Sequence, residues 1–256
     1  MKNLAIASGI VLLAILLLLT NTAQKPSVAF GAQYQSENSN IGATSGAVTV
    51  TAPTGIAVGD LLVGMSMIYR DGVPTCPSTW TPITSTNNDL DTVSCYKVAD
   101  VSDTVAPSFV FTYPVSTQVR GAAVMRFSDV DTTTPVSGAV TDFMASGDNS
   151  CAPSARTTTD ANDLVMVLGF SQEEGTWSFT IANASLVSEH VDVQTTAGND
   201  MSIAAASGPL TSVGGSGAIA GTRSNNVDEG ACHAFVIEGA AAAVPTAITS
   251  DIIMFE

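Results

Sequence analysis

Runs of apolar residues separated by short polar turns recur along the chain from residue 46 onward. Residues 46–53, GAVTVTAP, alternate apolar and polar side chains, which is typical of a half-buried strand. Residues 60–69, DLLVGMSMIY, and residues 163–170, DLVMVLGF, are continuous apolar runs and predict fully buried strands. No segment after residue 25 carries an apolar stripe of 3.6-residue period. The pattern therefore predicts an all-β body.

Further strands follow from the same pattern and from the turn residues between the apolar runs. A polar lead-in, residues 26–45, is expected to hold one short strand at 27–34. Pro107 and Pro114 bound the run FVFTY, and proline suits strand ends. The remaining expected strands are residues 92–100, 121–130, 176–182, 185–194, 201–207 and 231–239.

Two parts of the chain, residues 46–136 and 158–240, resemble each other in the order of their motifs. VGDLLVGMSM in the first half is similar to ANDLVMVLGF in the second, and GAAVMRFSDVD is similar to GACHAFVIEGA. Asp60 and Asp163 each begin a strand, where we expect them to hold a turn. Each half alone would leave an apolar face in water, so we expect the two to pack face to face. The expected architecture of residues 46–241 is a β-sandwich with two similar halves.

The first 25 residues form a separate hydrophobic segment. Between Lys2 and Lys25 stand 22 uncharged residues rich in Leu and Ile. As a helix this stretch would span about 33 Å, enough to cross a bilayer. Residues 1–25 are therefore a signal peptide or a transmembrane anchor, with residues 3–24 in the membrane if the segment is retained. An Ala-rich linker leads into a C-terminal tail, residues 242–256.

Composition and charge narrow the class of protein. Only 12% of the residues are charged, against roughly a quarter in an average protein. The net charge of −15 repels phosphate backbones, which argues against a nucleic-acid partner. Few charges, many small residues and an N-terminal hydrophobic segment are typical of an exported all-β protein.

The chain has four cysteines, which are either free thiols or disulfide partners: Cys76, Cys95, Cys151 and Cys232. None belongs to a CxxC motif, so the spacing does not indicate a zinc site. Three disulfide pairings are open to four cysteines, and four buried free thiols are a further alternative. We expect Cys76–Cys95, which closes a short loop, and Cys151–Cys232, which joins the start of the second half to its last strand.

The first half carries an ordered set of motifs: PTGIAVGDLLVGM, PSTWTPI, CYKVADVSDT, SFVFTY and GAAVMRFSDVDTTTPVSGAV. The second half continues with SARTTTDANDLVMVLGF. In this order and spacing the set, over residues 45–240, resembles a β-sandwich domain recurrent in phage and virus structural proteins of tails, fibres and particle surfaces. The resemblance implies a jelly-roll-like sandwich on a particle or fibre and implies no catalytic residues.

The chain holds few candidates for catalysis. Ser188, His190 and Asp192 share one face of a predicted strand, a geometry that does not aim three groups at one reacting atom. Glu173 and Glu174 are adjacent, so they do not face each other across a cleft as paired catalytic carboxylates do. No catalytic residue and no required cofactor is therefore predicted.

Two kinds of binding residue remain. Trp80 and Trp177 are candidates for stacking on a glycan, although core packing is the commoner role of Trp in β proteins. Weak candidate calcium ligands occur in two loops that lack the EF-hand pattern: Asp89, Asp91, Asp129 and Asp131.

The function that these observations favour is a non-enzymatic virion or surface structural protein used for assembly, host attachment or both. Its expected location is the virion surface, the cell envelope or the extracellular medium. Its expected partners are copies of itself, other virion or surface proteins, and a host glycan or receptor. One alternative is a secreted or cell-surface lectin-like binding module. Another is a fibre or pilus subunit that polymerises through its N-terminal segment or by strand donation.

Overall fold

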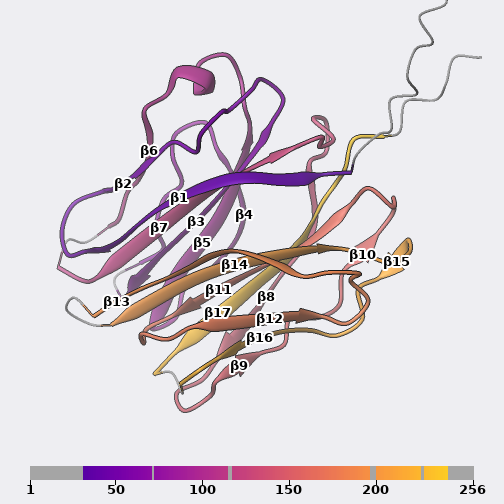
Figure 1. Cartoon of the computed structure of the whole chain (residues 1–256). Coiled ribbons are helices and arrows are strands. Elements are labelled where there is room, and N and C mark those ends of the chain that lie inside the picture. The colour runs from indigo at the N-terminus through magenta and orange to yellow at the C-terminus, as the bar shows by residue number, and fades with distance from the viewer. Residues whose placement is uncertain (1–30, 71, 115–116, 197–199, 226–227, 242–256) are drawn as a thin grey trace, which may run out of the picture. The chain divides into compact units, whose positions relative to one another are not determined.

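A computed structural model describes residues 31–70, 72–114, 117–196, 200–225 and 228–241, and Figure 1 shows their arrangement. Antiparallel strands dominate these residues, and their one helical element is a short 3-10 turn, η1 (Asp103–Val105). The prediction of an all-β body is therefore confirmed. The predicted hydrophobic helix of residues 1–25 and the tail 242–256 lie outside the described residues. Within the described ranges, no helix is long and apolar enough to cross a membrane.

Two five-stranded antiparallel sheets form the centre of the molecule. The strands of the first sheet are, in spatial order, β1 (Gln33–Ala43), β7 (Arg120–Ser128), β3 (Leu61–Tyr69), β5 (Leu90–Val98) and β4 (Thr81–Thr86). Those of the second are β8 (Val136–Met144), β17 (Gly230–Ile237), β11 (Leu164–Ser171), β14 (Met201–Pro209) and β13 (Ser188–Thr195). Counted along the chain, each sheet therefore has the order first, fifth, second, fourth, third. The two sheets share one connectivity.

A small layer of strands packs on the outer face of each sheet (Figure 1). On the first sheet this layer is β2 (Val48–Thr51) paired with β6 (Ser108–Phe111). On the second it is β12 (Trp177–Ile181), β16 (Ile219–Arg223) and β9 (Ser150–Cys151). A further pair is formed by β10 (Thr157–Thr158) and β15 (Gly214–Gly215). The pairs β2–β6 and β9–β16 occupy the same positions in the order of their halves.

The continuous apolar runs are explained by burial on both faces of the central strands. In β3, Leu61 and Val63 belong to the core between the two sheets, whereas Leu62 packs against the β2–β6 layer. In β11, Met166 faces the shared core and Val167 faces the outer layer of the second half. A strand covered on both sides needs apolar residues at every position, so the usual alternation disappears.

The two sheets meet face to face and also at both pairs of edges. Met65 and Phe127 of the first sheet pack in one buried cluster with Phe170 and Phe235 of the second. At one edge β1 lies beside β13, and at the other β4 lies beside β8. Thr84 Oγ1 and Thr141 Oγ1 form a hydrogen bond of 2.9 Å across the second of these edges. Side chains from both halves thus fill the space between the sheets.

Two edge strands differ from the expected boundaries. β1 occupies most of the predicted polar lead-in, and β8 begins at the end of the predicted first half and runs into the segment before the second. The strands of the two sheets span residues 33–128 and 136–237 instead of 46–136 and 158–240. Most residues of both strands are partly or fully exposed. An exposed edge strand carries little apolar signal, which is why the hydrophobic pattern did not reveal these two.

The aspartates that precede β3 and β11 have equivalent turn contacts. Oδ2 of Asp60 accepts a hydrogen bond of 2.7 Å from the backbone N–H of Ala57, three residues earlier. Oδ2 of Asp163 accepts one of 2.9 Å from the backbone N–H of Asp160, also three residues earlier. The predicted role of these aspartates in turns is confirmed.

Candidate functional site

A surface hollow of about 420 Å³ lies beside Trp80 in the first half. Its volume falls in the range of small-molecule pockets, ~300–1,000 Å³. The hollow is formed by the turn before β4, the end of β5, the η1 segment and the start of β6. We call it the Trp80 hollow, and its lining residues are Pro77, Ser78, Thr79, Trp80, Lys97, Asp100, Ser102, Asp103, Ala106, Ser108, Phe109 and Val110.

Two aromatic rings form the apolar part of the Trp80 hollow. Trp80 packs edge-on against Phe109, with ring centroids 5.2 Å apart. The six-membered part of the indole points inward, where its Cζ3 lies 3.0 Å from the position that a Cβ on Gly64 would occupy. Only 8% of Trp80 is exposed. Most of the indole therefore packs inside the protein, and the role of Trp80 in stacking on a glycan stays a prediction.

One wall of the Trp80 hollow holds a compensated charge cluster. Nζ of Lys97 lies 2.7 Å from Oδ2 of Asp103 and 3.1 Å from Oδ2 of Asp100. Burial opposes the charge on Lys97, but the hydrogen bonds to the two carboxylates outweigh it and raise the pKa of the lysine. The Ser102 hydroxyl, with help from Lys97, lowers the pKa of Asp100 to about 2. Lys97 and Asp100 are therefore charged at neutral pH, and the cluster sets one lysine against two aspartates.

Several neutral polar groups around the hollow have no partner in the described part of the chain. The hydroxyls of Ser78, Thr79 and Ser108 form no side-chain hydrogen bond there, and neither does the indole N–H of Trp80. Thr79 also has a backbone φ of 72°, which is unusual for a β-branched residue. Such strain is found disproportionately at binding and catalytic sites.

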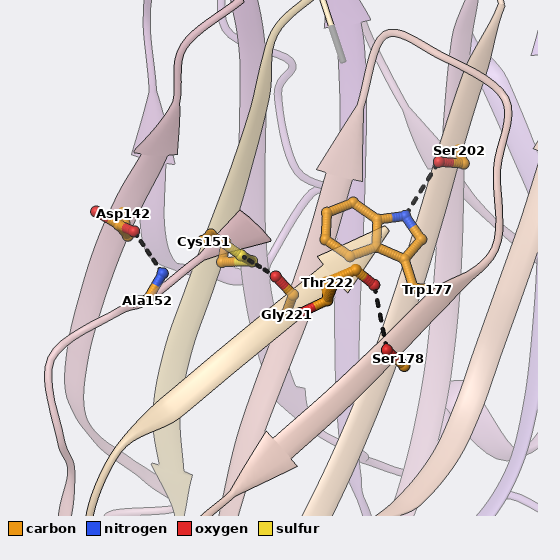
Figure 2. Close-up of a disulfide and its surroundings, with 9 residues drawn as sticks. Asp142, Cys151, Ala152, Trp177, Ser178, Ser202, Gly221 and Thr222 are labelled. Carbon is orange, nitrogen blue, oxygen red and sulfur yellow. Dashed lines mark hydrogen bonds between the residues drawn. A yellow bond between two sulfur atoms is a disulfide. The ribbon is translucent and has the colours of Figure 1, made fainter. Parts of the chain in front are cut away.

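Trp177, the second predicted stacking residue, lies in the other half and belongs to a packed layer. Its ring stacks on Phe179 at 5.7 Å, and the guanidinium of Arg223 lies 5.7 Å from the Trp177 ring centroid. The indole N–H donates a hydrogen bond of 3.0 Å to Ser202 Oγ, as Figure 2 shows. Trp177 is 4% exposed. Both the ring and the N–H thus have partners inside the protein, and the role of Trp177 in stacking on a glycan stays a prediction.

One of the two expected disulfides is present. Cys151 of β9 and Cys232 of β17 are bonded, with their Cα atoms 6.0 Å apart (Figure 2). The bond ties the outer layer of the second half to the central sheet. Gly221 lies against it, because a Cβ there would come within 3.0 Å of both sulfur atoms.

The other expected disulfide, Cys76–Cys95, is not formed in the structure, where both residues are free thiols. Cys95 is fully buried in β5, and Cys76 is half-buried in the connection before β4. Burial raises the pKa of the Cys95 thiol, and a hydrogen bond with Cys76 raises it further. Disulfide formation proceeds through a thiolate, so the raised pKa of Cys95 slows its oxidation.

The four candidate calcium ligands serve as local structural groups. Asp89 pairs with Arg70 at 2.7 Å, and Asp91 is buried and accepts a hydrogen bond from the backbone N–H of Gly72. Asp129 has a φ of 57°, and Asp131 accepts backbone hydrogen bonds in the following turn. Among the described residues, no three side chains of His, Cys, Asp or Glu are grouped so that they would hold a metal ion.

Both histidines have structural partners. His190 forms a hydrogen bond of 2.7 Å with Ser207 rather than with Ser188. His233 lies between the sheets, where its two ring nitrogens contact Thr92 Oγ1 at 2.9 Å and Ser94 Oγ at 3.0 Å. Both ring nitrogens of His233 thus have partners.

The sequence pattern pointed to Trp80 but missed most of the hollow around it. The motif CYKVADVSDT contains Lys97, Asp100 and Asp103, but no pattern in the sequence indicated that these residues lie near Trp80. Phe109 and Ser108 come from β6, which reaches the site only through its pairing with β2. No protein-family model, no curated protein and no solved structure matches this chain.

Proposed function

We propose that the protein is a non-enzymatic structural protein displayed on a virion or cell surface as a jelly-roll-like β-sandwich. The observation that carries this proposal is the shared core of the two sheets, which is filled by side chains such as Met65, Phe127, Phe170 and Phe235. Because the inner faces are occupied in this way, the loops and outer layers are the parts that meet other molecules.

Two further observations support the same function. A disulfide-bonded, β-rich chain is compatible with an extracellular location, where such bonds persist. The two histidines contribute contacts between the halves. The ordered motif set adds the resemblance to phage and virus surface domains.

The test is mass spectrometry of the natural particle or cell envelope. We expect the protein in that fraction, together with other surface proteins, and we expect added protease to reach it without lysis. A protein found only as a free monomer in solution, or protected inside the cell, would overturn the proposal.

The lectin-like alternative is favoured by one specific observation, the Trp80 hollow. A displayed structural protein that binds a ligand through this hollow combines both functions.

A further inference from the structure

We propose that the Trp80 hollow is a binding site for a neutral saccharide. The argument rests on which polar groups the fold leaves without partners. The neutral ones, the hydroxyls of Ser78, Thr79 and Ser108 and the indole N–H of Trp80, are unpaired within the described residues. A saccharide presents closely spaced hydroxyls that donate and accept hydrogen bonds, so it satisfies such groups without bringing a charge.

The charges of the hollow exclude anionic ligands. Lys97 is already held by Asp100 and Asp103. An incoming carboxylate or sulfate would have to compete with both aspartates for it. The whole chain carries a net charge of −15, which adds a long-range repulsion. Sialylated, uronic or sulfated glycans are therefore poor ligands for this site.

The exposed carboxylate of Asp100 is a hydrogen-bond acceptor for the hydroxyls of a neutral ligand. Its side chain is 56% exposed, and each carboxylate oxygen has more than one acceptor position. Oδ1 accepts hydrogen bonds from the backbone N–H and the hydroxyl of Ser102, which fix the carboxylate in place. A carboxylate held in this way accepts hydrogen bonds from neighbouring sugar hydroxyls, and bonds to a charged acceptor are the stronger kind.

The apolar lining supports a sugar ring rather than a peptide strand. Pro77, Phe109 and Val110 border the hollow and offer carbon surface to the C–H groups of a pyranose. A peptide bound by strand addition would need an open sheet edge beside the site. Beside the hollow, however, β6 already pairs with β2, and Thr112 forms a β-bridge with Thr75 just after β6 ends.

The binding test uses the full exported chain on an array of neutral, anionic and amino oligosaccharides, followed by titration calorimetry of the glycans that bind. We expect neutral glycans to bind and anionic ones to fail. Lack of binding to any neutral glycan, or preferential binding of anionic or amino glycans, would overturn the inference. Because display is tested separately by particle composition, failure here would leave the proposed function standing.

Two matched pairs of variants locate the site. Trp80→Phe keeps an aromatic ring and removes the unpaired N–H, so we expect about tenfold weaker binding, the size of one lost hydrogen bond. Trp177→Phe removes an indole N–H that is bonded to Ser202 outside the hollow, and it should leave affinity unchanged. Asp100→Asn should weaken binding about fivefold or more, whereas Asp148→Asn, in another exposed turn, should not.

The second pair keeps the test decisive if Trp80→Phe does not fold, because Asp100 is exposed and its replacement spares the core. Thermal unfolding of each variant establishes whether it is folded before binding is measured. Equal affinities of Asp100→Asn and Asp148→Asn would contradict the assignment of the saccharide to the Trp80 hollow.

Discussion

His190 stacks on Tyr34 with ring centroids 3.9 Å apart and the ring planes inclined by 14°. The two residues come from β13 and β1, the neighbouring edges of the two sheets. His233 makes a second link, from β17 to Thr92 and Ser94 of β5. Both histidines of the chain thus join the first half to the second. Burial lowers the pKa of His190 to about 4 and that of His233 to about 3.

Acid is therefore expected to weaken the contact between the halves. An unfolded histidine titrates near pH 6.5, so between that pH and the folded pKa the unfolded state binds a proton that the folded state excludes. The free energy of unfolding is then highest above about pH 6.5 and falls as the pH drops toward 4 for His190 and 3 for His233. Each histidine contributes about 1.4 kcal/mol per pH unit inside its window. Urea unfolding at pH 7, 6, 5 and 4 measures this slope.

The control for this prediction is His190→Phe, which keeps a ring for Tyr34 and cannot be protonated. Its stability at pH 7 is expected to be lower, because Ser207 loses its partner. Its slope between pH 6.5 and 4 should be shallower than that of the wild type. Carboxylates titrate in both proteins and cancel in the comparison. Equal slopes would show that His190 does not drive the acid sensitivity.

Removing the disulfide is expected to destabilise the fold strongly. Cys151 and Cys232 are 81 residues apart in the sequence, and a cross-link closing a loop of this length stabilises by about 4 kcal/mol through the unfolded state. The double variant Cys151→Ala/Cys232→Ala should lose about that much in denaturant unfolding. Cys76→Ala removes a free, half-buried thiol and should lose far less. A reductant should destabilise the wild type and leave the double variant unchanged, and an unchanged wild type would contradict the prediction.

The central strands and their turns could be predicted from the sequence because their signals are local. Continuous apolar runs marked β3 and β11, and an acidic residue after a turn marked where each begins. The edge strands β1 and β8 were missed or cut short because they bury few side chains. Their positions are set by backbone pairing with β7 and β17, which leaves little trace in hydrophobicity.

The candidate site was less predictable than the fold. Trp80 was identified from its residue type, but only 8% of it is exposed, and most of the groups that line the hollow are its neighbours. Lys97 and Asp103 are six residues apart, and only the turn at η1 brings their side chains to 2.7 Å. Trp80 and Trp177 had the same candidate role in the sequence. Among the described residues, however, the N–H of Trp177 has a hydrogen-bond acceptor and that of Trp80 has none.

A glycine inside β11 makes room for the outer layer and should not tolerate a methyl group. A Cβ on Gly169 would lie 2.8 Å from two ring atoms of Trp177. That ring is buried and held by Ser202, so it cannot move aside freely. Gly169→Ala should therefore destabilise the protein by about 1–3 kcal/mol, the usual cost of overpacking. Gly215→Ala is the control, since a Cβ there meets no atom within 4 Å. Equal unfolding midpoints for the two variants would contradict this account.

Asp163, the turn aspartate before β11, should contribute more to the free energy of unfolding than an aspartate in an exposed turn. Asp163 is 1% exposed. Its Oδ2 accepts hydrogen bonds of 3.0 and 2.9 Å from the backbone N–H groups of Thr159 and Asp160, and its Oδ1 accepts one of 3.0 Å from that of Gly239. Asp163→Ala leaves these donors without an acceptor and should cost about 3 kcal/mol of unfolding free energy. Asp163→Asn keeps one acceptor oxygen and should cost less.

Asp131 provides the matched comparison for this last prediction. It accepts hydrogen bonds from the backbone N–H groups of Thr133 and Thr134, but in an exposed turn where water replaces a lost acceptor. Asp131→Ala should therefore cost about 1 kcal/mol or less. Hydrogen exchange adds a local readout, because the Gly239 amide should lose protection in Asp163→Ala and keep it in Asp131→Ala. If both variants lose the same stability and the Gly239 amide stays protected, then the buried carboxylate does not hold the start of β11 to the end of β17.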